Sequence, residues 1–235
     1  MSQRRCYTLR CPGCQGLERI ETFLSFNADR LAHLKPQVLE GGLLRHTCES
    51  CQLTYYPEHA WLYTEPSACC WVVIMPRAER HYYPQLERAV GEELTAQVQR
   101  MPEALASWRR IRPRLVFGVP FLQELLWLEQ GGYSPVVAEA LKLLVYRRRL
   151  AEVVGQGPVE LCLEGREEAA WRLGLYGFVD SRRRGTLLVP LEWWEEARAL
   201  EGWQRREQPL LFSAPYLSVS RYLYLGRVRP GSGGG

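Results

Sequence analysis

The sequence lacks any apolar run long enough to cross a membrane. Its longest apolar stretches are residues 68–75 and a helical stretch near Leu141, and both are shorter than the roughly 20 residues that a spanning helix needs. No apolar signal segment follows the basic residues Arg4 and Arg5 near the N-terminus. We therefore expect a cytoplasmic protein without a membrane span.

A strong excess of one charge is also absent. The chain has 30 Lys and Arg against 26 Asp and Glu, a net charge of +4, with an isoelectric point near 8.6. Dedicated nucleic-acid-binding domains are usually more basic. Nucleic-acid binding remains an alternative, because basic runs could share one face, although nearby glutamates could neutralise them. The runs are Arg109–Arg114, Arg147–Arg149, Arg182–Arg184 and Arg205–Arg206.

Local motifs of common enzymes are missing as well. The sequence has no G-x-S-x-G, no Walker loop and no G-x-G-x-x-G, and neither Cys-x-x-Cys pair has the H-x-E partner of a zinc deaminase. Cys69 and Cys70 lie in an apolar run, which would raise a thiol pKa and disfavour a nucleophile. An enzyme with an unrecognised site in the C-terminal part remains a second alternative, since a site built from distant residues leaves no local motif.

What the sequence does contain is two Cys-x-x-Cys pairs, Cys11/Cys14 and Cys48/Cys51. Each pair can supply two corners of a tetrahedron, so the spacing predicts one closed, structural Zn²⁺ site. Disulfides would need an oxidising compartment, and a redox pair would need a helix N-terminus. Catalytic zinc would need an open coordination position, which four thiolates do not leave. His46, two residues before Cys48, is a candidate neighbour or alternative ligand, and we prefer an ordinary surface histidine.

The other four cysteines have no such spacing. We expect them to be reduced, buried, small apolar side chains. They are Cys6, Cys69, Cys70 and Cys162.

Several segments around the cysteines carry a resemblance. The Cys-Pro-x-Cys opening, Ser-Phe-Asn-Ala-Asp at 25–29, Leu-Glu-Gly-Gly-Leu-Leu at 39–44 and Tyr56-Pro57 together resemble the bacterial CpXC domain family, which is functionally uncharacterised. The similarity is firmest over residues 6–76 and weaker over 111–146. The second pair departs from the family pattern, because it lacks the proline and the following glycine. The resemblance implies the same four ligands and no particular reaction.

The N-terminal part, residues 1–76, is predicted to be a zinc-ribbon-like, β-rich module. Alternating apolar residues predict strands at 5–10 and 17–26 around the first pair, and short strands flank the second pair. Helical spacing predicts a short helix over 31–39, with a break at Pro36 as an alternative. The apolar run before Pro76 predicts a central strand.

The rest of the chain is predicted to be a connecting amphipathic helix at 77–107, a larger α+β module at 108–229 and a flexible tail at 230–235. The fold class is therefore α+β, with a C-terminal sheet that we expect to be antiparallel. The C-terminal helices are expected at 120–130, 134–150 and 191–202, and the strands at 115–117, 159–163, 171–179, 186–190, 210–213 and 216–225.

These features favour a non-enzymatic binding or adaptor protein whose zinc site is structural and whose partner is another protein. Aromatic residues near the C-terminus could form a docking surface, although we expect at least one of the adjacent Trp193 and Trp194 in the core. The others are Trp203, Tyr222 and Tyr224. The sequence leaves the partner, the pathway and the oligomeric state open.

Overall fold

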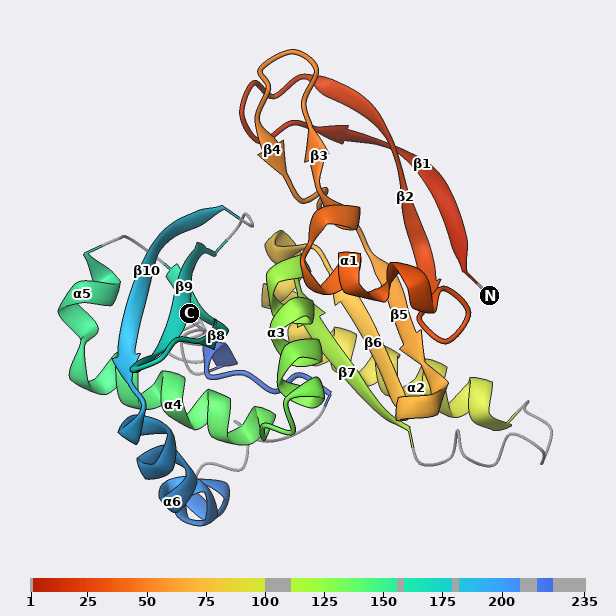
Figure 1. The fold of residues 1–235 in the computed structure, drawn as a ribbon. Helices are drawn as coiled ribbons and strands as arrows, with labels where there is room; N and C mark the ends of the chain where they lie inside the picture. The colour runs from red at the N-terminus through yellow and green to blue at the C-terminus, as the bar shows by residue number, and fades with distance from the viewer. Residues whose placement is uncertain (1, 100–110, 156–158, 179–181, 208–214, 222–235) are drawn as a thin grey trace, which may run out of the picture.

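The computed structural model describes residues 2–99, 111–155, 159–178, 182–207 and 215–221. It contains a five-stranded mixed sheet, a three-stranded antiparallel sheet and a two-stranded hairpin, together with helices (Figure 1). The predicted α+β class is confirmed.

The five-stranded sheet has the order β1-β2-β5-β6-β7. Its first two strands, β1 (Gln3–Arg10) and β2 (Leu17–Asn27), form the antiparallel hairpin that the alternating pattern predicted. The register shifts between Gln3 and Arg4, so that Arg4 pairs with Phe23 while Gln3 pairs with Ser25. This irregularity leaves Leu24 at the surface and buries Phe23, whereas an uninterrupted alternation through residues 17–26 was expected.

Beside β2, the other inner strands of this sheet are β5 (Trp61–Glu65) and β6 (Cys70–Met75), and β7 (Arg112–Phe117) is its second edge. Strand β5 runs parallel to β2, and β7 runs parallel to β6. The apolar run at 69–75 is therefore a central strand, as predicted. Strand β7, which the sequence analysis placed in a second module, completes the N-terminal sheet. This sheet therefore contains strands from both sides of residue 76, the predicted module boundary.

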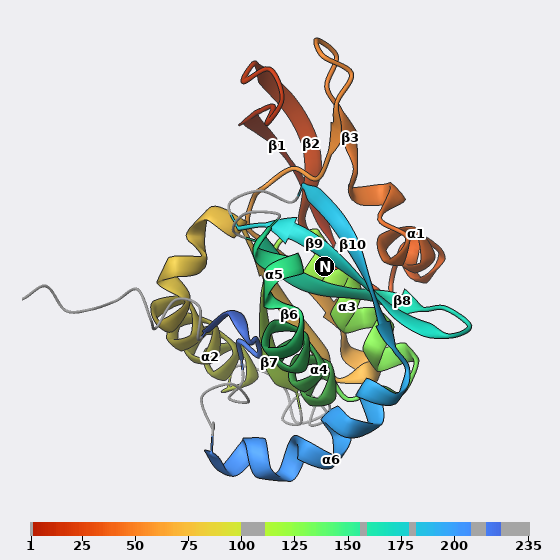
Figure 2. The ribbon, with the colours of Figure 1, turned by 90° about the vertical axis from the view of Figure 1, so that its left-hand side faces the viewer.

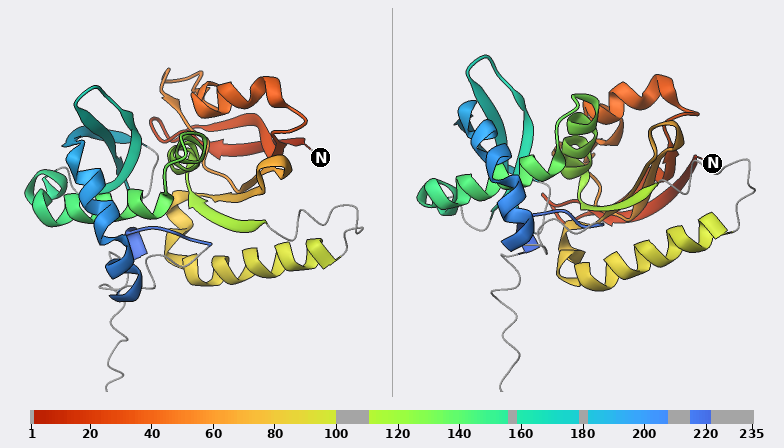
Figure 3. Two further views of the ribbon diagram at one scale, coloured as in Figure 1. Left: turned by 60° about the horizontal axis from the view of Figure 1, so that its bottom comes forward. Right: turned by 90° about the horizontal axis from the view of Figure 1, so that it is seen from below.

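Helices cover both faces of the sheet (Figure 3). The chain from β6 to β7 passes through η4 (Arg77–Tyr82) and α2 (Tyr83–Gln99), and Val90 and Leu94 of α2 pack on Trp71 and Leu115. The opposite face is covered by α1 (Lys35–Leu39) and α3 (Val119–Gln130). A short η1 (Ala32–Leu34) precedes α1, so the break at Pro36 is confirmed.

The C-terminal body consists of α4 (Pro135–Arg148), α5 (Leu150–Val154), α6 (Glu192–Glu207) and an antiparallel sheet. Its strands, in the order β10-β9-β8, are β8 (Val159–Arg166), β9 (Ala170–Gly177) and β10 (Arg183–Pro190). Ser134 caps α4 by accepting a hydrogen bond from the Val137 N–H at 3.4 Å. The helices pack on one face of the sheet (Figure 2).

The aromatic residues of α6 divide as the sequence analysis expected. Trp194 is buried against Trp171, whereas Trp193 is half-buried with the Arg148 guanidinium 4.8 Å from its ring centroid. Tyr222 and Tyr224 lie outside the described residues, as does the side chain of Trp203.

Two expectations for the C-terminus have different outcomes. The strand predicted over 216–225 is wrong where the structure describes it, because residues 216–218 have no regular structure, residue 219 is in a turn and residues 220–221 are helical. The strand predicted at 210–213 lies outside the described residues. No helix in the described part of the chain is both long and apolar enough to span a membrane.

Candidate metal centre

The four cysteines of the two Cys-x-x-Cys pairs come together in space. Their sulfur atoms lie within 4.8 Å of one another, with 3.6 Å between Cys11 Sγ and Cys51 Sγ and between Cys14 Sγ and Cys48 Sγ. Cys11 and Cys48 are buried, and Cys14 and Cys51 are exposed. Such a cluster is compatible with one four-coordinate metal ion.

The first pair lies in the turn between β1 and β2, and the second lies between β3 (His46–Thr47) and β4 (Thr54–Tyr55). We call residues 11–16 the first knuckle and residues 48–53 the second knuckle. Both occupy the far end of the molecule from the C-terminal helices, as Figure 1 shows.

The two knuckles share one backbone geometry. In each, the N–H of the first cysteine donates to the carbonyl five residues later at 2.9 Å, and the N–H of the following glutamine returns to the cysteine carbonyl at 2.9 Å. Gln15 and Gln52 adopt left-handed conformations with φ of 64° and 60°. The second knuckle therefore has the same turn as the first, although it lacks the proline and glycine of the family pattern.

Backbone donors point at the sulfurs. The Gly13 N–H donates to Cys11 Sγ at 3.3 Å, and the Cys51 N–H donates to Cys48 Sγ at 3.5 Å. Burial alone would raise the pKa of Cys11, but the N–H groups of Cys14 and Gly13 lower this pKa to about 7. A thiolate is thus available near neutral pH, which is the form that binds metal.

Close packing of the knuckles explains the glycine at position 13. A Cβ atom there would lie 2.9 Å from Leu53 Cδ2 and 3.1 Å from Cys51 Sγ, both on the second knuckle. A larger residue at this position would require the Leu53 side chain and Cys51 Sγ to shift.

Glu18 of β2 joins the β3–β4 hairpin, the second hairpin, to the β1–β2 hairpin, the first. The sequence analysis did not identify Glu18. Its Oε1 accepts from the Glu49 N–H at 2.9 Å, and its Oε2 accepts from the Tyr55 hydroxyl at 3.0 Å and lies 3.2 Å from His46 Nε2. Burial would raise the pKa of Glu18, but the Glu49 N–H lowers it. His46 faces this carboxylate, so it lies beside the cysteine cluster in contact with Glu18.

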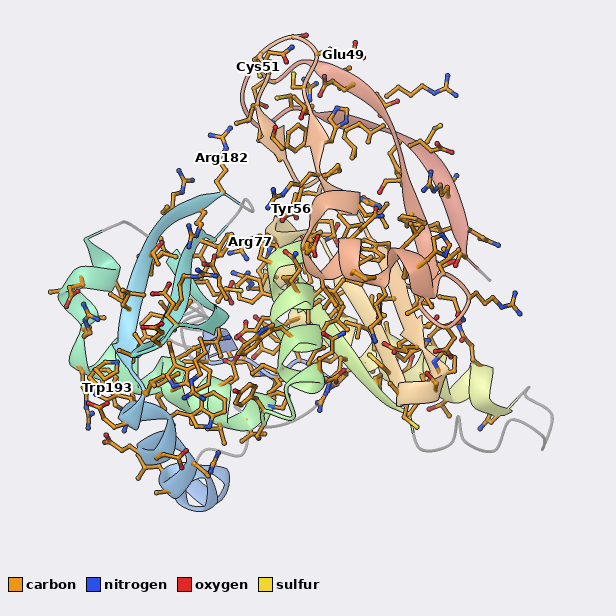
Figure 4. The ribbon with its side chains drawn as sticks, viewed as in Figure 1. Glu49, Cys51, Tyr56, Arg77, Arg182 and Trp193 are labelled. Carbon is orange, nitrogen blue, oxygen red and sulfur yellow. The ribbon has the colours of Figure 1, made fainter. Side chains whose placement is uncertain are left out.

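A cleft of about 560 Å³ separates the second hairpin from the β9–β10 end of the C-terminal sheet. Figure 4 shows Arg182 beside β10 directed toward the knuckles, with Arg77 below it and Tyr56 to the right of both. The Arg182 guanidinium donates to the Pro12 carbonyl of the first knuckle. The cleft is lined by Arg10, Arg45, Arg182 and Arg183 and by Tyr55, Tyr56 and Tyr176, among others.

The arginine runs are largely paired where the structure describes their side chains. Arg148 pairs with Glu196, Arg149 with Glu152, and Arg183 with Glu164. Residues 109 and 110 and the side chains of residues 112, 205 and 206 lie outside the described part. Local neutralisation by glutamates, which the charge pattern suggested, is observed for these pairs.

A buried network of charges lies between the two sheets, and no sequence signal indicated it. Lys142 of α4 is 2% exposed and contacts Glu124 at 2.7 Å and Glu139 at 2.6 Å. Arg77 and Arg80 pair with Glu160, Arg77 at 3.2 Å. The adjoining cavity holds only about 50 Å³, which is room for a water molecule or two and not for a substrate.

The remaining cysteines differ in exposure. Cys70 and Cys162 are buried, and burial raises the pKa of each, as expected for reduced core thiols. Cys69 is partly buried. Cys6 is exposed on β1, so its expected burial is wrong, because β1 is an edge strand with most of its side chains in solvent.

Comparison with known proteins identifies one family. The family model described as CpXC protein matches residues 9–142, more than half of the chain and including all four clustered cysteines. No curated protein and no solved structure gives a match.

Proposed function

Because the chain belongs to the CpXC family, we propose that it is a non-enzymatic binding or adaptor protein of the bacterial cytoplasm, stabilised by one structural Zn²⁺. Cys11, Cys14, Cys48 and Cys51 would hold the ion. The observation that carries the proposal is that the knuckles form a wall of the 560 Å³ cleft. The ion would shape a recess for a protein partner.

The donor set favours zinc. Four sulfur ligands in two Cys-x-x-Cys loops, with N–H groups directed at two of the sulfurs, match a closed tetrahedral site. Four thiolates fill the coordination sphere of Zn²⁺, so a bound ion would have a structural role.

The lining of the cleft supports a protein partner. Tyrosine and arginine are the residue types that most often dominate binding energy at protein interfaces, and the cleft presents three tyrosines and four arginines. The nucleic-acid alternative gains no support from the basic runs, because Arg148, Arg149 and Arg183 are each paired with a glutamate. The enzyme alternative gains none from the Lys142 network, whose adjoining cavity is about 50 Å³.

Metal content tests the zinc site. Protein purified without added metal should contain close to one zinc per chain, and serine at both Cys11 and Cys48 should abolish this content. Zinc retention in the double variant, or another transition metal at one equivalent, would contradict the assignment.

Site-specific crosslinking tests the partner class. A photo-crosslinking amino acid at Thr54, which is exposed and lines the cleft, should give a discrete adduct in cells that protease destroys and nuclease does not. The same residue at Glu21, exposed on β2 outside the cleft, is the control. No adduct, a nuclease-sensitive adduct or an equal yield at Glu21 would contradict a protein partner in the cleft.

A further inference from the structure

We propose that the cleft binds an extended, acidic peptide segment of a protein partner, which lies along the outer edge of β4 and directs carboxylates toward Arg45 and Arg182. This inference rests on the proposed function and adds the chemical class of the partner segment and the backbone edge that receives it.

Charge gives the first argument. Four arginines line the cleft against one acidic residue, Glu58. Arg183 is paired with Glu164, and the Glu58 carboxylate accepts from the Arg77 backbone N–H at 2.8 Å, so the lining keeps an excess of positive charge. Arg45 is exposed, and its Nε donates to the Tyr56 hydroxyl at 3.3 Å while its guanidinium lies 5.7 Å from the Tyr56 ring centroid. Tyr56 thus holds this guanidinium at the cleft wall, where its planar fork can take a carboxylate.

The edge of β4 gives the second argument. The four consecutive residues Leu53, Thr54, Tyr55 and Tyr56 all line the cleft. Side chains of a strand alternate between two faces, so consecutive residues line one recess only when the backbone edge itself borders it. Strand β4 pairs with β3 alone in the described part of the chain, which leaves this edge able to hydrogen-bond to an extended peptide.

The shape of the recess gives the third argument. A second cavity of about 250 Å³ shares Arg45, Tyr56 and Tyr176 with the cleft and continues toward Trp127 and Pro120. Two recesses that adjoin across the same three side chains suit a chain molecule better than a compact anion. Because Trp127, Pro120 and Leu39 line the far part, an apolar side chain is expected to follow the acidic residues of the segment.

The charges of the second cavity favour a peptide over a nucleic acid strand. Glu40, Glu124 and Glu164 also line it, and a strand with a phosphate at every nucleotide would bring negative charge beside them. A peptide can place its acidic residues at the arginines and neutral residues beyond.

The test uses the full-length, zinc-loaded protein and fluorescein-labelled decapeptide pools, with binding followed by fluorescence anisotropy. The acidic pool carries Asp or Glu at its first four positions and Leu, Val, Phe or Tyr at the next four. A matched pool carries Lys or Arg in place of the acids, and oligothymidylate of ten nucleotides is the nucleic-acid probe. We expect saturable binding of the acidic pool and at least tenfold weaker binding of the other two.

Variants locate the binding. Arg45→Glu should weaken binding of the acidic pool at least tenfold, and Arg45→Gln should weaken it less. Arg19→Glu makes the same change of charge on β2 of the β1–β2 hairpin, at an exposed residue outside the cleft, and should change affinity less than twofold. Zinc content and circular dichroism confirm the folding of each variant, and Arg10→Glu, at another exposed arginine of the cleft, replaces Arg45→Glu if the latter does not fold.

Backbone pairing is tested with the acidic pool methylated at alternate backbone nitrogens, which should bind at least fivefold more weakly. The inference is overturned by no binding of the acidic pool, by tighter binding of oligothymidylate, by equal losses in Arg45→Glu and Arg19→Glu, or by full binding of the methylated pool. If the acidic pool fails while the Thr54 adduct with a protein persists, the adaptor function stands and the acidic class is wrong.

Discussion

The knuckles and the C-terminal body are held together in different ways. The core of the body contains 18 buried apolar side chains from α3–α6 and β8–β10. In the two knuckles, residues 11–16 and 48–53, only Cys11 and Cys48 are buried. Loops with so little apolar burial gain little from packing to offset the entropy of ordering, and the proposed metal ion would supply the missing stabilisation.

Metal loss is expected to have the largest effect, and it should destabilise the knuckles while the C-terminal body stays folded. Cys48→Ser should lower the hydrogen-exchange protection of amides in residues 11–16 and 46–55 by roughly a hundredfold or more, because structural zinc contributes about 10 kcal/mol in small zinc domains. Amides of α4 and β9 should keep their protection. Cys6→Ser, at an exposed cysteine, is the control and should leave both regions unchanged; equal behaviour of the two variants would contradict a structural metal.

Removal of the buried ammonium is expected to be the next largest effect. Lys142→Ala leaves the carboxylates of Glu124 and Glu139 buried without a cation, which should lower the free energy of unfolding by about 3–5 kcal/mol. Urea unfolding monitored by circular dichroism measures this. Arg148→Ala removes the surface pair with Glu196 and should cost about 1 kcal/mol or less. A loss of about 1 kcal/mol or less in Lys142→Ala would contradict the inference that the buried carboxylates need this cation.

The stability of the protein should also depend on pH through Glu124, a buried carboxyl outside the knuckles. Burial raises the pKa of Glu124 to about 7, against about 4.3 in an unfolded chain. The folded state then holds a proton that the unfolded state has released, so stability should fall as pH rises from about 4.3 to 7.

Glu124→Gln should remove this component. The loss of stability between pH 5 and pH 7.5 should be smaller in the variant than in the wild type by roughly 1–3 kcal/mol, measured by urea unfolding at both pH values. Identical pH profiles of the two proteins would contradict a raised pKa at this carboxyl.

The cap of α4 should give the smallest effect. Ser134→Ala removes the acceptor for the Val137 N–H and should lower stability by about 1 kcal/mol, while Ser134→Asp should restore it. The midpoint of thermal unfolding measures both. An unchanged midpoint in Ser134→Ala would contradict the capping role of Ser134.

Local patterns predicted much of the fold. The hairpin of β1 and β2, the break before α1 at Pro36, the central strand β6 and the cap at Ser134 follow from residues close in sequence. The irregularity at Leu24 and the unstructured residues 216–218 did not, since both depend on which distant backbone lies alongside. The division into modules remains a prediction, and the pairing of β7 with β6 joins residues on both sides of the proposed boundary.

The sequence by itself determined the two cysteine pairs, because two residues between cysteines form a turn that directs both sulfurs to one side, and each turn needs no other part of the chain. Only the tertiary structure decided the role of Glu18, the burial of Lys142 and the cleft with Arg45 and Arg182. These features join side chains that are 18 to more than 130 residues apart. Which charges face one another at such separations depends on how the sheets and helices pack, and no local spacing in the sequence encodes it.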